Sequence, residues 1–111
     1  MKILSKEFFI SPDQSVLKGH FPGNPILPGV MLLNFISDTL SERLGRQCHI
    51  KKIIRHKFIK PVLPEFRICV ECQLKQTQTE FDNCYLVNCD IFDQYKHLIA
   101  SGQYKVECLP S

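Results

Sequence analysis

Apolar and polar residues alternate along much of the second half of the chain, and this alternation predicts β-strands. In residues 66–75 almost every second side chain is apolar, which is the period of a strand with one buried face. Short polar stretches separate the alternating segments, and the one at 93–96 can form a turn between two antiparallel strands. We expect strands at 4–10, 50–60, 66–75, 84–92 and 97–108.

The pattern is helical between residues 30 and 44. The first two turns of this helix are apolar almost all round, which is typical of a buried helix. Gly45 suits the position just after a helix, and Arg43 suits its last turn. The preceding residues 14–29 contain three prolines and three glycines, so they predict an ordered loop. One buried helix against an antiparallel sheet is an α+β fold.

Composition places the chain among globular proteins. Its 111 residues are 44% hydrophobic and 23% charged, which fits one domain spanning 1–111 and excludes a disordered chain. No apolar run approaches the roughly 18 residues of a membrane span. The first residues show no signal peptide, so we expect a cytoplasmic protein without a membrane span.

The six cysteines do not form a recognisable disulfide or zinc pattern. Cys69 and Cys72 are three residues apart in a predicted strand, so their side chains face opposite sides. Cys48 and Cys108 have no near partner. A zinc site needs two ligand pairs at suitable spacing, and the chain lacks them. We expect free, mostly buried thiols and no metal.

The residues with the clearest chemical potential are GHFPGNPILPGV at 19–30. His20 lies in a loop stiffened by prolines, and an imidazole with a pKa of about 6.5 suits acid–base catalysis. The backbone N–H groups of Gly29, Val30 and Met31 lack acceptors within the helix, so they could stabilise an oxyanion. This combination suits proton abstraction beside a thioester carbonyl. A loop whose histidine only binds backbone is the alternative.

The motif HFPGNPILPGV resembles the signature of the hot-dog-fold 3-hydroxyacyl-acyl-carrier-protein dehydratases of bacterial fatty-acid synthesis. The sequence KFIKPVLP at 57–64 also matches the family's basic and aromatic strand followed by Pro-Val-x-Pro. The resemblance implies a curved antiparallel sheet wrapped round one central helix, and a dimer with active sites between subunits. It implies no cofactor of the enzyme's own, because the acyl group is carried on the phosphopantetheine of acyl carrier protein.

The resemblance also implies roles for individual residues. His20 corresponds to the catalytic histidine, and the amides of Gly29 and Val30 correspond to those that bind the thioester oxygen. The family's carboxylate, which comes from the partner subunit, is replaced here by Asn34. An amide cannot deliver a proton to a leaving hydroxyl. Asp38 lies one turn further along the same helix face and could act instead through a water molecule, or merely be a polar interface residue.

Every charged residue between 43 and 64 is basic, although the net charge of the chain is only +3. Such a block attracts acidic partners, and the resemblance implies acyl carrier protein as that partner. A solvated surface is the alternative, and nucleic acid is not expected because no aromatic and basic stacking motif is present. The predicted carrier-docking residues are Arg46, Lys51, Lys52, Arg55 and Lys57.

These observations lead to one preferred function and two alternatives. The preferred function is a dehydratase that forms trans-2-enoyl thioesters in fatty-acid or polyene/polyketide biosynthesis. The first alternative is a hot-dog thioesterase, which polarises the same carbonyl but admits an attacking water. The second is one subunit of a heterodimer whose homologous partner supplies the catalytic acid.

Overall fold

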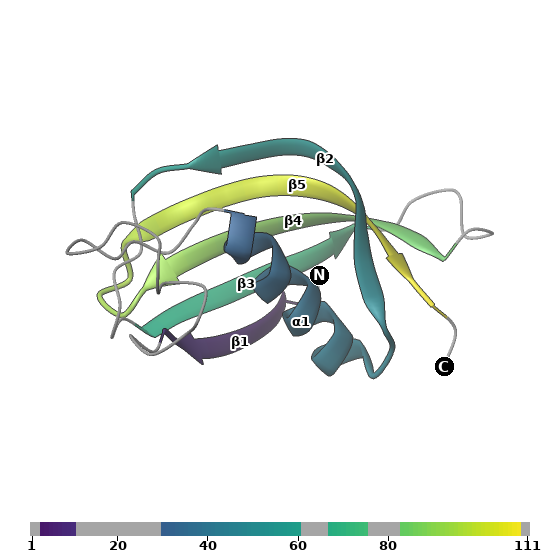
Figure 1. Ribbon diagram of the computed structural model, residues 1–111, viewed down its shortest axis with the longest axis horizontal. Helices are drawn as coiled ribbons and strands as arrows, with labels where there is room; N and C mark the ends of the chain where they lie inside the picture. The colour runs from purple at the N-terminus through teal and green to yellow at the C-terminus, as the bar shows by residue number, and fades with distance from the viewer. Residues whose placement is uncertain (1–2, 11–29, 61–66, 76–82, 110–111) are drawn as a thin grey trace, which may run out of the picture.

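The computed structural model describes residues 3–10, 30–60, 67–75 and 83–109. Within these residues the chain forms five strands and one helix (Figure 1). In chain order they are β1 Ile3–Phe9, α1 Val30–Leu44, β2 Cys48–Phe58, β3 Arg67–Lys75, β4 Cys84–Asp93 and β5 Leu98–Cys108.

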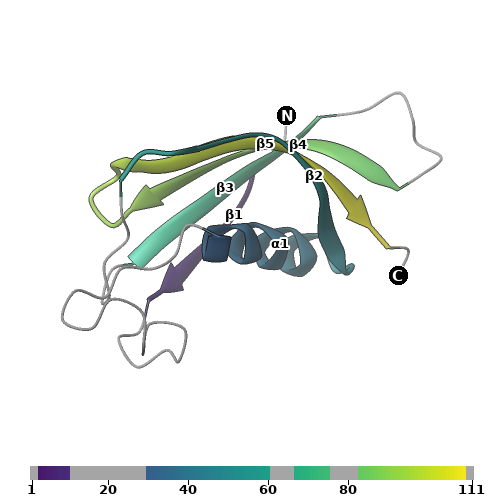
Figure 2. The same ribbon diagram turned by 45° about the horizontal axis from the view of Figure 1, so that its top comes forward.

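The strands form one sheet in the order β1-β3-β4-β5-β2, and every neighbouring pair is antiparallel. The sheet is curved, and α1 lies within its concave side (Figures 1 and 2). Strands β1 and β2 are the two edges. The α+β arrangement predicted from the alternating pattern is therefore confirmed, as is the antiparallel pairing of the last two strands.

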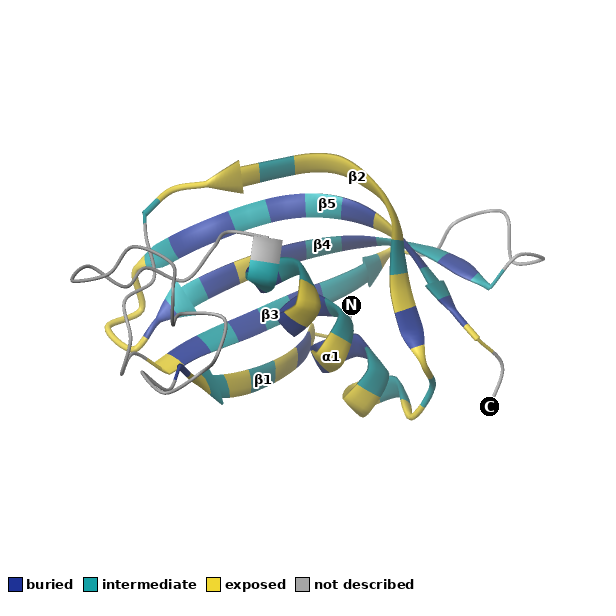
Figure 3. Cartoon of the chain, in the orientation of Figure 1, coloured by how far each residue is buried: buried dark blue, intermediate teal, exposed yellow. Residues whose placement is uncertain are grey.

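The buried core lies between α1 and the concave face of the sheet. Bands of buried and more exposed residues alternate along β3, β4 and β5, as Figure 3 shows. Burial of one large aliphatic side chain stabilises a fold by roughly 1.5–3 kcal/mol, so the helix is held mainly by these contacts. Its fully buried apolar side chains are Leu32, Ile36 and Leu40, and Phe35 is almost as well covered.

Helix α1 has the bounds that the sequence predicts. It is followed by Gly45 at φ +67°, a left-handed conformation in which glycine avoids the strain of a side chain. Arg43 in the last turn donates a hydrogen bond from Nε to the carbonyl oxygen of Ser5, at 2.7 Å, and so links the helix to β1. No helix in the described part of the chain is long and apolar enough to cross a membrane.

Strand β2 differs from its predicted range of 50–60. It begins at Cys48, ends at Phe58 and shows register shifts in its pairing with β5 at two places. The shifts lie between Ile50 and Lys52 and between Ile53 and Arg55. Such irregularities are common at sheet edges, where they bend the strand. They also explain why the sequence of β2 lacks the strict alternation seen in β3.

All six cysteines are free thiols and five of them are buried, as predicted. The expectation that Cys48 and Cys108 have no near partner is wrong. These residues are directly opposite in the pairing of β2 with β5, and their sulfur atoms are 2.7 Å apart. Cys72 and Cys89 are likewise opposite on β3 and β4, with a sulfur separation of 3.1 Å. Sheet pairing, which is not visible in local spacing, creates both contacts.

Candidate functional site

A groove of about 500 Å³ lies between α1 and the first half of β2. Apolar side chains form part of its wall, and an amide, a hydroxyl and an imidazole add polar groups. We call it the α1–β2 groove. Its lining residues are Leu33, Asn34, Ser37, His49, Ile50, Lys51, Lys52 and Ile53.

Asn34 presents an exposed side-chain amide to this groove. Its Nδ2 atom lies 3.6 Å from the sulfur of Met31, which is only a weak acceptor. The amide is therefore able to bind a group that enters the groove. Among the described residues that line the groove there is no carboxylate. Asp38 is exposed on the next helical turn and does not belong to the lining, so the groove holds an amide where the resemblance implies the family's carboxylate.

The start of α1 provides a second feature of the site. The helix begins at Val30, and no acidic side chain lies in its first turn. The N–H groups of this turn lack acceptors within the helix, and the helix dipole favours negative charge there. Nothing acidic in the turn itself competes for these donors. His20 and Gly29 lie outside the described residues, so their roles remain predictions.

Two polar residues of the groove were not among the predicted site residues. Ser37 is three residues after Asn34, so helical spacing alone places both on one side of α1. His49 lies within the basic stretch 43–64 of the sequence. Its place in the groove depends on how β2 packs beside the helix, and no local pattern indicates this.

A partly buried polar pair joins β2 to β5 outside the lining of the groove. The Nδ1 atom of His56 lies 2.5 Å from the hydroxyl of Tyr104, whose side chain is fully buried. Burial raises the pKa of Tyr104, which keeps the phenol neutral. We interpret this contact as structural, because it satisfies a polar group inside the core.

The predicted carrier-docking residues differ in the contacts that they make. Arg46 lies over the ring of Tyr85 and donates a hydrogen bond to its hydroxyl at 3.2 Å, which raises the pKa of Arg46. Lys51 forms an ion pair with Glu107 at 3.6 Å. Arg46 is thus held against Tyr85 of β4, whereas Lys51 is held by Glu107 of β5.

The remaining cations follow β2 and its neighbour β5. Lys52 is directly opposite Lys105, and both line a hollow of about 440 Å³ with Lys51. Arg55 and Lys57 lie further along the same strand. Within the described residues, no ion pair is formed by Lys52, Lys105, Arg55 or Lys57. Lys105 was not predicted, because only the strand register places it beside Lys52.

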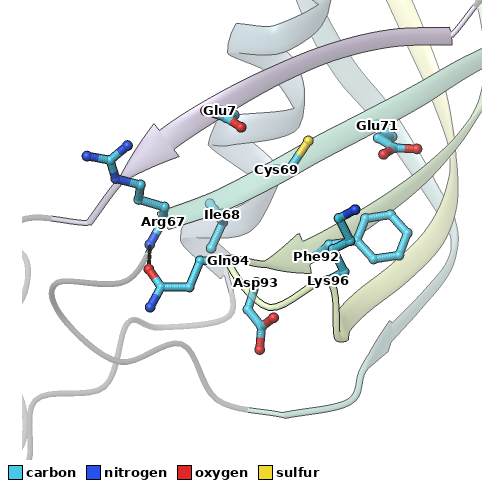
Figure 4. A pocket seen from close by; sticks show the side chains of 9 residues that line it. All are labelled: Glu7, Arg67, Ile68, Cys69, Glu71, Phe92, Asp93, Gln94 and Lys96. Atoms are coloured by element: carbon cyan, nitrogen blue, oxygen red, sulfur yellow. Dashed lines mark hydrogen bonds between the residues drawn. The ribbon is translucent and has the colours of Figure 1, made fainter.

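Another hollow, of about 510 Å³, lies on the convex side of the sheet (Figure 4). It combines acids and bases, including Glu7, Glu71 and Arg67, around the thiol of Cys69. Burial and then the charges of Glu71 and Glu7 raise the pKa of Cys69. A thiol that stays protonated is a poor nucleophile. Since α1 lies behind the strands in this view, the convex hollow is separate from the α1–β2 groove.

Comparison with known proteins identifies the family. The family described as ApeI-like, ApeI dehydratase, matches residues 2–99. The chain belongs to the ApeI-like dehydratase family. The ApeI-like chain is also 30% identical over 102 residues to the 3-hydroxyacyl-acyl-carrier-protein dehydratase FabZ of Haemophilus influenzae, covering 82% of this chain and 69% of FabZ. It spans about half the length of other curated FabZ relatives that it matches.

Solved structures confirm the hot-dog fold of this ApeI-like protein. The dehydratase heterocomplex ApeI:P from Xenorhabdus doucetiae matches with a TM-score of 0.74 and 19% identity, covering 96% of this chain and 88% of that chain. A Thermus thermophilus protein described as a thioesterase superfamily member also gives a TM-score of 0.74, with 15% identity and coverages of 98% and 82%. At these identities the likeness shows the fold.

Proposed function

We propose that this ApeI-like chain is a dehydratase subunit that acts on 3-hydroxyacyl groups bound to acyl carrier protein. The reaction breaks a C2–H bond and the C3–O bond, releases water and leaves a trans-2-enoyl thioester. Membership of the ApeI-like family over residues 2–99 is the observation that carries this proposal. The matched residues include the motif with His20, all of α1 and the α1–β2 groove. The likeness to FabZ supports the carrier-bound substrate.

In this proposal His20 removes the proton from C2 of the substrate. The negative charge that develops on the thioester oxygen is stabilised by backbone N–H groups at Gly29 and Val30, where the helix dipole adds a favourable field. The absence of acidic side chains in the first turn of α1 supports this role. Asn34 of a second copy of this chain orients the 3-hydroxyl, directly or through a water molecule.

The leaving hydroxyl needs a proton, and Asn34 cannot supply it. One source is Asp38 of a second copy of this chain, which would make a homodimer sufficient. The other is a carboxylate on a different hot-dog subunit. The lack of any acid among the described groove residues supports a partner as the source. The ApeI:P heterocomplex, which has this fold, supports a second subunit of the same kind.

Acyl carrier protein is the proposed source of substrate, and the cations around Lys52 are its proposed docking site. Lys52 and Lys105 are exposed, directly opposite each other and without an ion pair in the described part of the chain. An acidic carrier is attracted to such an unneutralised pair. No cofactor is needed for the proposed reaction, because it transfers only protons and water.

The test is a mass-spectrometric assay of 3-hydroxyacyl carrier protein with the wild type, His20→Ala, Asn34→Asp and the control His97→Gln. His97 lies in the turn after β4 and is not a lining residue of the groove, so we expect its variant to keep wild-type turnover. We expect loss of water that depends on His20. Wild-type inactivity together with water loss by Asn34→Asp indicates a site that lacks only its acid. Full activity of His20→Ala contradicts the proposal.

A thioesterase is the second candidate function. The exposed amide of Asn34, which stands where the family has a carboxylate, favours it because an amide can hold an attacking water. The same assay distinguishes the reactions. A thioesterase releases the whole acyl group as a free acid and leaves a free thiol on the carrier, whereas a dehydratase leaves an enoyl group still attached.

A further inference from the structure

The imidazole of His56 on β2 has one ring nitrogen bound and the other without a partner. Its Nδ1 atom lies 2.5 Å from the hydroxyl of Tyr104 and satisfies that buried phenol. This structural role accounts for Nδ1 only, because no described residue forms a hydrogen bond with Nε2. The side chain of His56 is only partly buried, so Nε2 is able to bind a further group.

The register between β2 and β5 shows which way His56 faces. His56 is directly opposite Gly102, and Phe58 is directly opposite Ala100. Residues directly opposite on antiparallel strands have their side chains on the same face of the sheet. Ala100 belongs to the core between α1 and the sheet, so His56 and Phe58 also face the concave side.

This part of the concave side is continuous with the α1–β2 groove. Ile53 lines the groove and is directly opposite Tyr104, so it precedes His56 on the same face of β2. Three residues of a strand span about 10 Å. Both β2 and β5 extend beyond the start of α1 (Figures 1 and 2). His56 therefore faces the concave space that adjoins the start of the helix.

Among the described residues, nothing covers this space. Ile53 is 47% exposed and Phe58 is 41% exposed although both face inward, whereas Cys48 at the start of β2 is 2% exposed. Sites for small molecules are typically apolar surfaces that carry a few well-placed polar groups. The imidazole between these two apolar side chains fits that description.

The contact with Tyr104 also determines where His56 carries its proton. Burial raises the pKa of Tyr104, so the phenol keeps its proton. A buried O–H group needs an acceptor, and within the described part of the chain Nδ1 of His56 is the acceptor in reach. Tyr104 therefore donates its hydrogen bond to Nδ1, which leaves the ring proton of the neutral imidazole on Nε2.

We propose that His56 is a catalytic residue that donates a hydrogen bond from Nε2 to the 3-hydroxyl oxygen of the substrate, and that Tyr104 is the positioning residue that fixes its tautomer. The 3-hydroxyl oxygen gains negative charge as the C3–O bond breaks, and a fixed N–H donor stabilises this charge. A neutral imidazole is a donor and not a strong acid, so the source of the leaving proton stays as proposed above. This inference rests on the proposed dehydration and adds a residue to it.

Ring ¹⁵N NMR of the histidine-labelled chain, in the assembly that it forms, tests this hydrogen bond without turnover. The probe is 3-hydroxybutyryl pantetheine in which an amide replaces the thioester, and its control is the butyryl compound without the hydroxyl. We expect the Nε2 resonance of His56, assigned by its absence in His56→Gln, to shift with the hydroxylated probe alone. The His97 resonance is the internal control. Tyr104→Phe is expected to replace the single tautomer of His56 by a mixture.

Turnover of 3-hydroxyacyl carrier protein tests the contribution to catalysis. Loss of the donor in His56→Ala is expected to lower kcat by about 100-fold. Tyr104→Phe lowers kcat by a smaller factor, and the double variant is no slower than His56→Ala, because Tyr104 acts through His56. His56→Gln, whose side-chain N–H can donate, recovers part of kcat. His97→Gln controls for the loss of an imidazole elsewhere, and thermal unfolding checks that each variant is folded.

Three results overturn the inference. The first is a His56 resonance that shifts equally with both probes or with neither. The second is wild-type kcat in folded His56→Ala. The third is an additive loss of kcat in the double variant, which would show that Tyr104 acts through the fold. If His56→Ala does not fold, Tyr104→Phe and the two probes decide.

The proposed function and this inference fail in different ways. A wild type that releases no water in any assembly contradicts the proposed dehydration. In that case a shift of His56 that depends on the hydroxyl still supports the contact with the substrate, and the absence of such a shift overturns it.

Discussion

Asp93 is a buried charge that organises the turn between β4 and β5. Its carboxylate accepts backbone hydrogen bonds from Tyr95 at 2.8 Å and His97 at 2.9 Å, and it pairs with the Lys60 ammonium at 3.1 Å. Burial alone would raise the pKa of Asp93, but the His97 N–H, the Lys60 ammonium and the Tyr95 N–H hold it below its usual value. The folded state therefore prefers the charged form.

Replacement of Asp93 by Asn is expected to lower the free energy of unfolding by about 1–3 kcal/mol at neutral pH, because the ion pair is lost and an amide replaces one acceptor. Lys60→Gln is expected to lower the free energy of unfolding by less, since both backbone hydrogen bonds to the Asp93 carboxylate remain. A carboxyl whose pKa is lowered by folding stabilises the fold above the unfolded value of about 3.9, and this stabilisation is lost as the pH falls through the folded pKa. Urea unfolding at several pH values measures the difference in unfolding free energy between the wild type and Asp93→Asn. This difference narrows below about pH 4. A constant difference down to the acid range contradicts this account.

Gly102 is required by close packing around the pair formed by His56 and Tyr104. A Cβ atom at this position would lie 2.5 Å from the carbonyl oxygen of Arg55 and would also collide with the Tyr104 hydroxyl. Gly102→Ala is therefore expected to destabilise the fold by about 1–3 kcal/mol. Thermal unfolding measures this change against Ser101→Ala, a small residue at the adjacent, less buried position. Equal melting temperatures for the two variants would show that β2 yields to the added methyl group.

At the scale of the strands, the register between neighbours brings cysteines together in pairs. An oxidant such as diamide is expected to remove one hydrogen from each thiol and link Cys48 to Cys108 and Cys72 to Cys89. Burial, then contact with Cys48, raises the pKa of Cys108 to about 12, so thiolate is scarce at neutral pH and bridging accelerates as the pH rises. Peptide mapping without reductant identifies the links.

The variant Cys48→Ser is the matched control for these bridges, because it removes the first and leaves the second. Reaction confined to the less buried Cys69, or bridges only between different molecules, would contradict the predicted pairing. A bridge between residues 48 and 108 would join the edge strand β2 to β5 covalently, close to the end of α1.

The same elements show what the sequence can and cannot predict. The bounds of α1 follow from local signals, namely its apolar period and Gly45, so they were predicted correctly. The strands also follow from local alternation, except at β2, where the bulges disrupt it. Contacts across strands depend on register instead. No local pattern indicates that Cys48 meets Cys108, that Lys105 flanks Lys52, or that His49 joins Asn34 in the groove.

At the scale of the whole molecule, four cations without a described ion pair follow β2 and its neighbour β5, namely Lys52, Arg55, Lys57 and Lys105. Elsewhere in the described part of the chain several cations are already engaged. Lys6 binds Glu42, Lys60 binds Asp93, and Arg46 lies against Tyr85. The electrostatic field of these cations therefore attracts an acidic partner in solution toward the side formed by β2 and β5.

This field leads to a prediction about substrate delivery in the assembly that is catalytically active. The double change K52E/K105E is expected to raise KM for carrier-bound 3-hydroxyacyl substrate roughly tenfold at low salt, because it reverses the charge where the carrier docks. Neither residue is a proposed catalytic group, so kcat is expected to stay unchanged. Because Lys52 also lines the α1–β2 groove, the single change K105E, which lies outside that lining, is measured beside the double change. A small pantetheine thioester has no protein surface to dock, so its KM stays at the wild-type value. R67E/K75E, with the same change in net charge on β3, leaves both KM values unaltered. If KM rises equally for both substrates in K52E/K105E, the two lysines act on the groove or the fold, and the carrier is bound elsewhere.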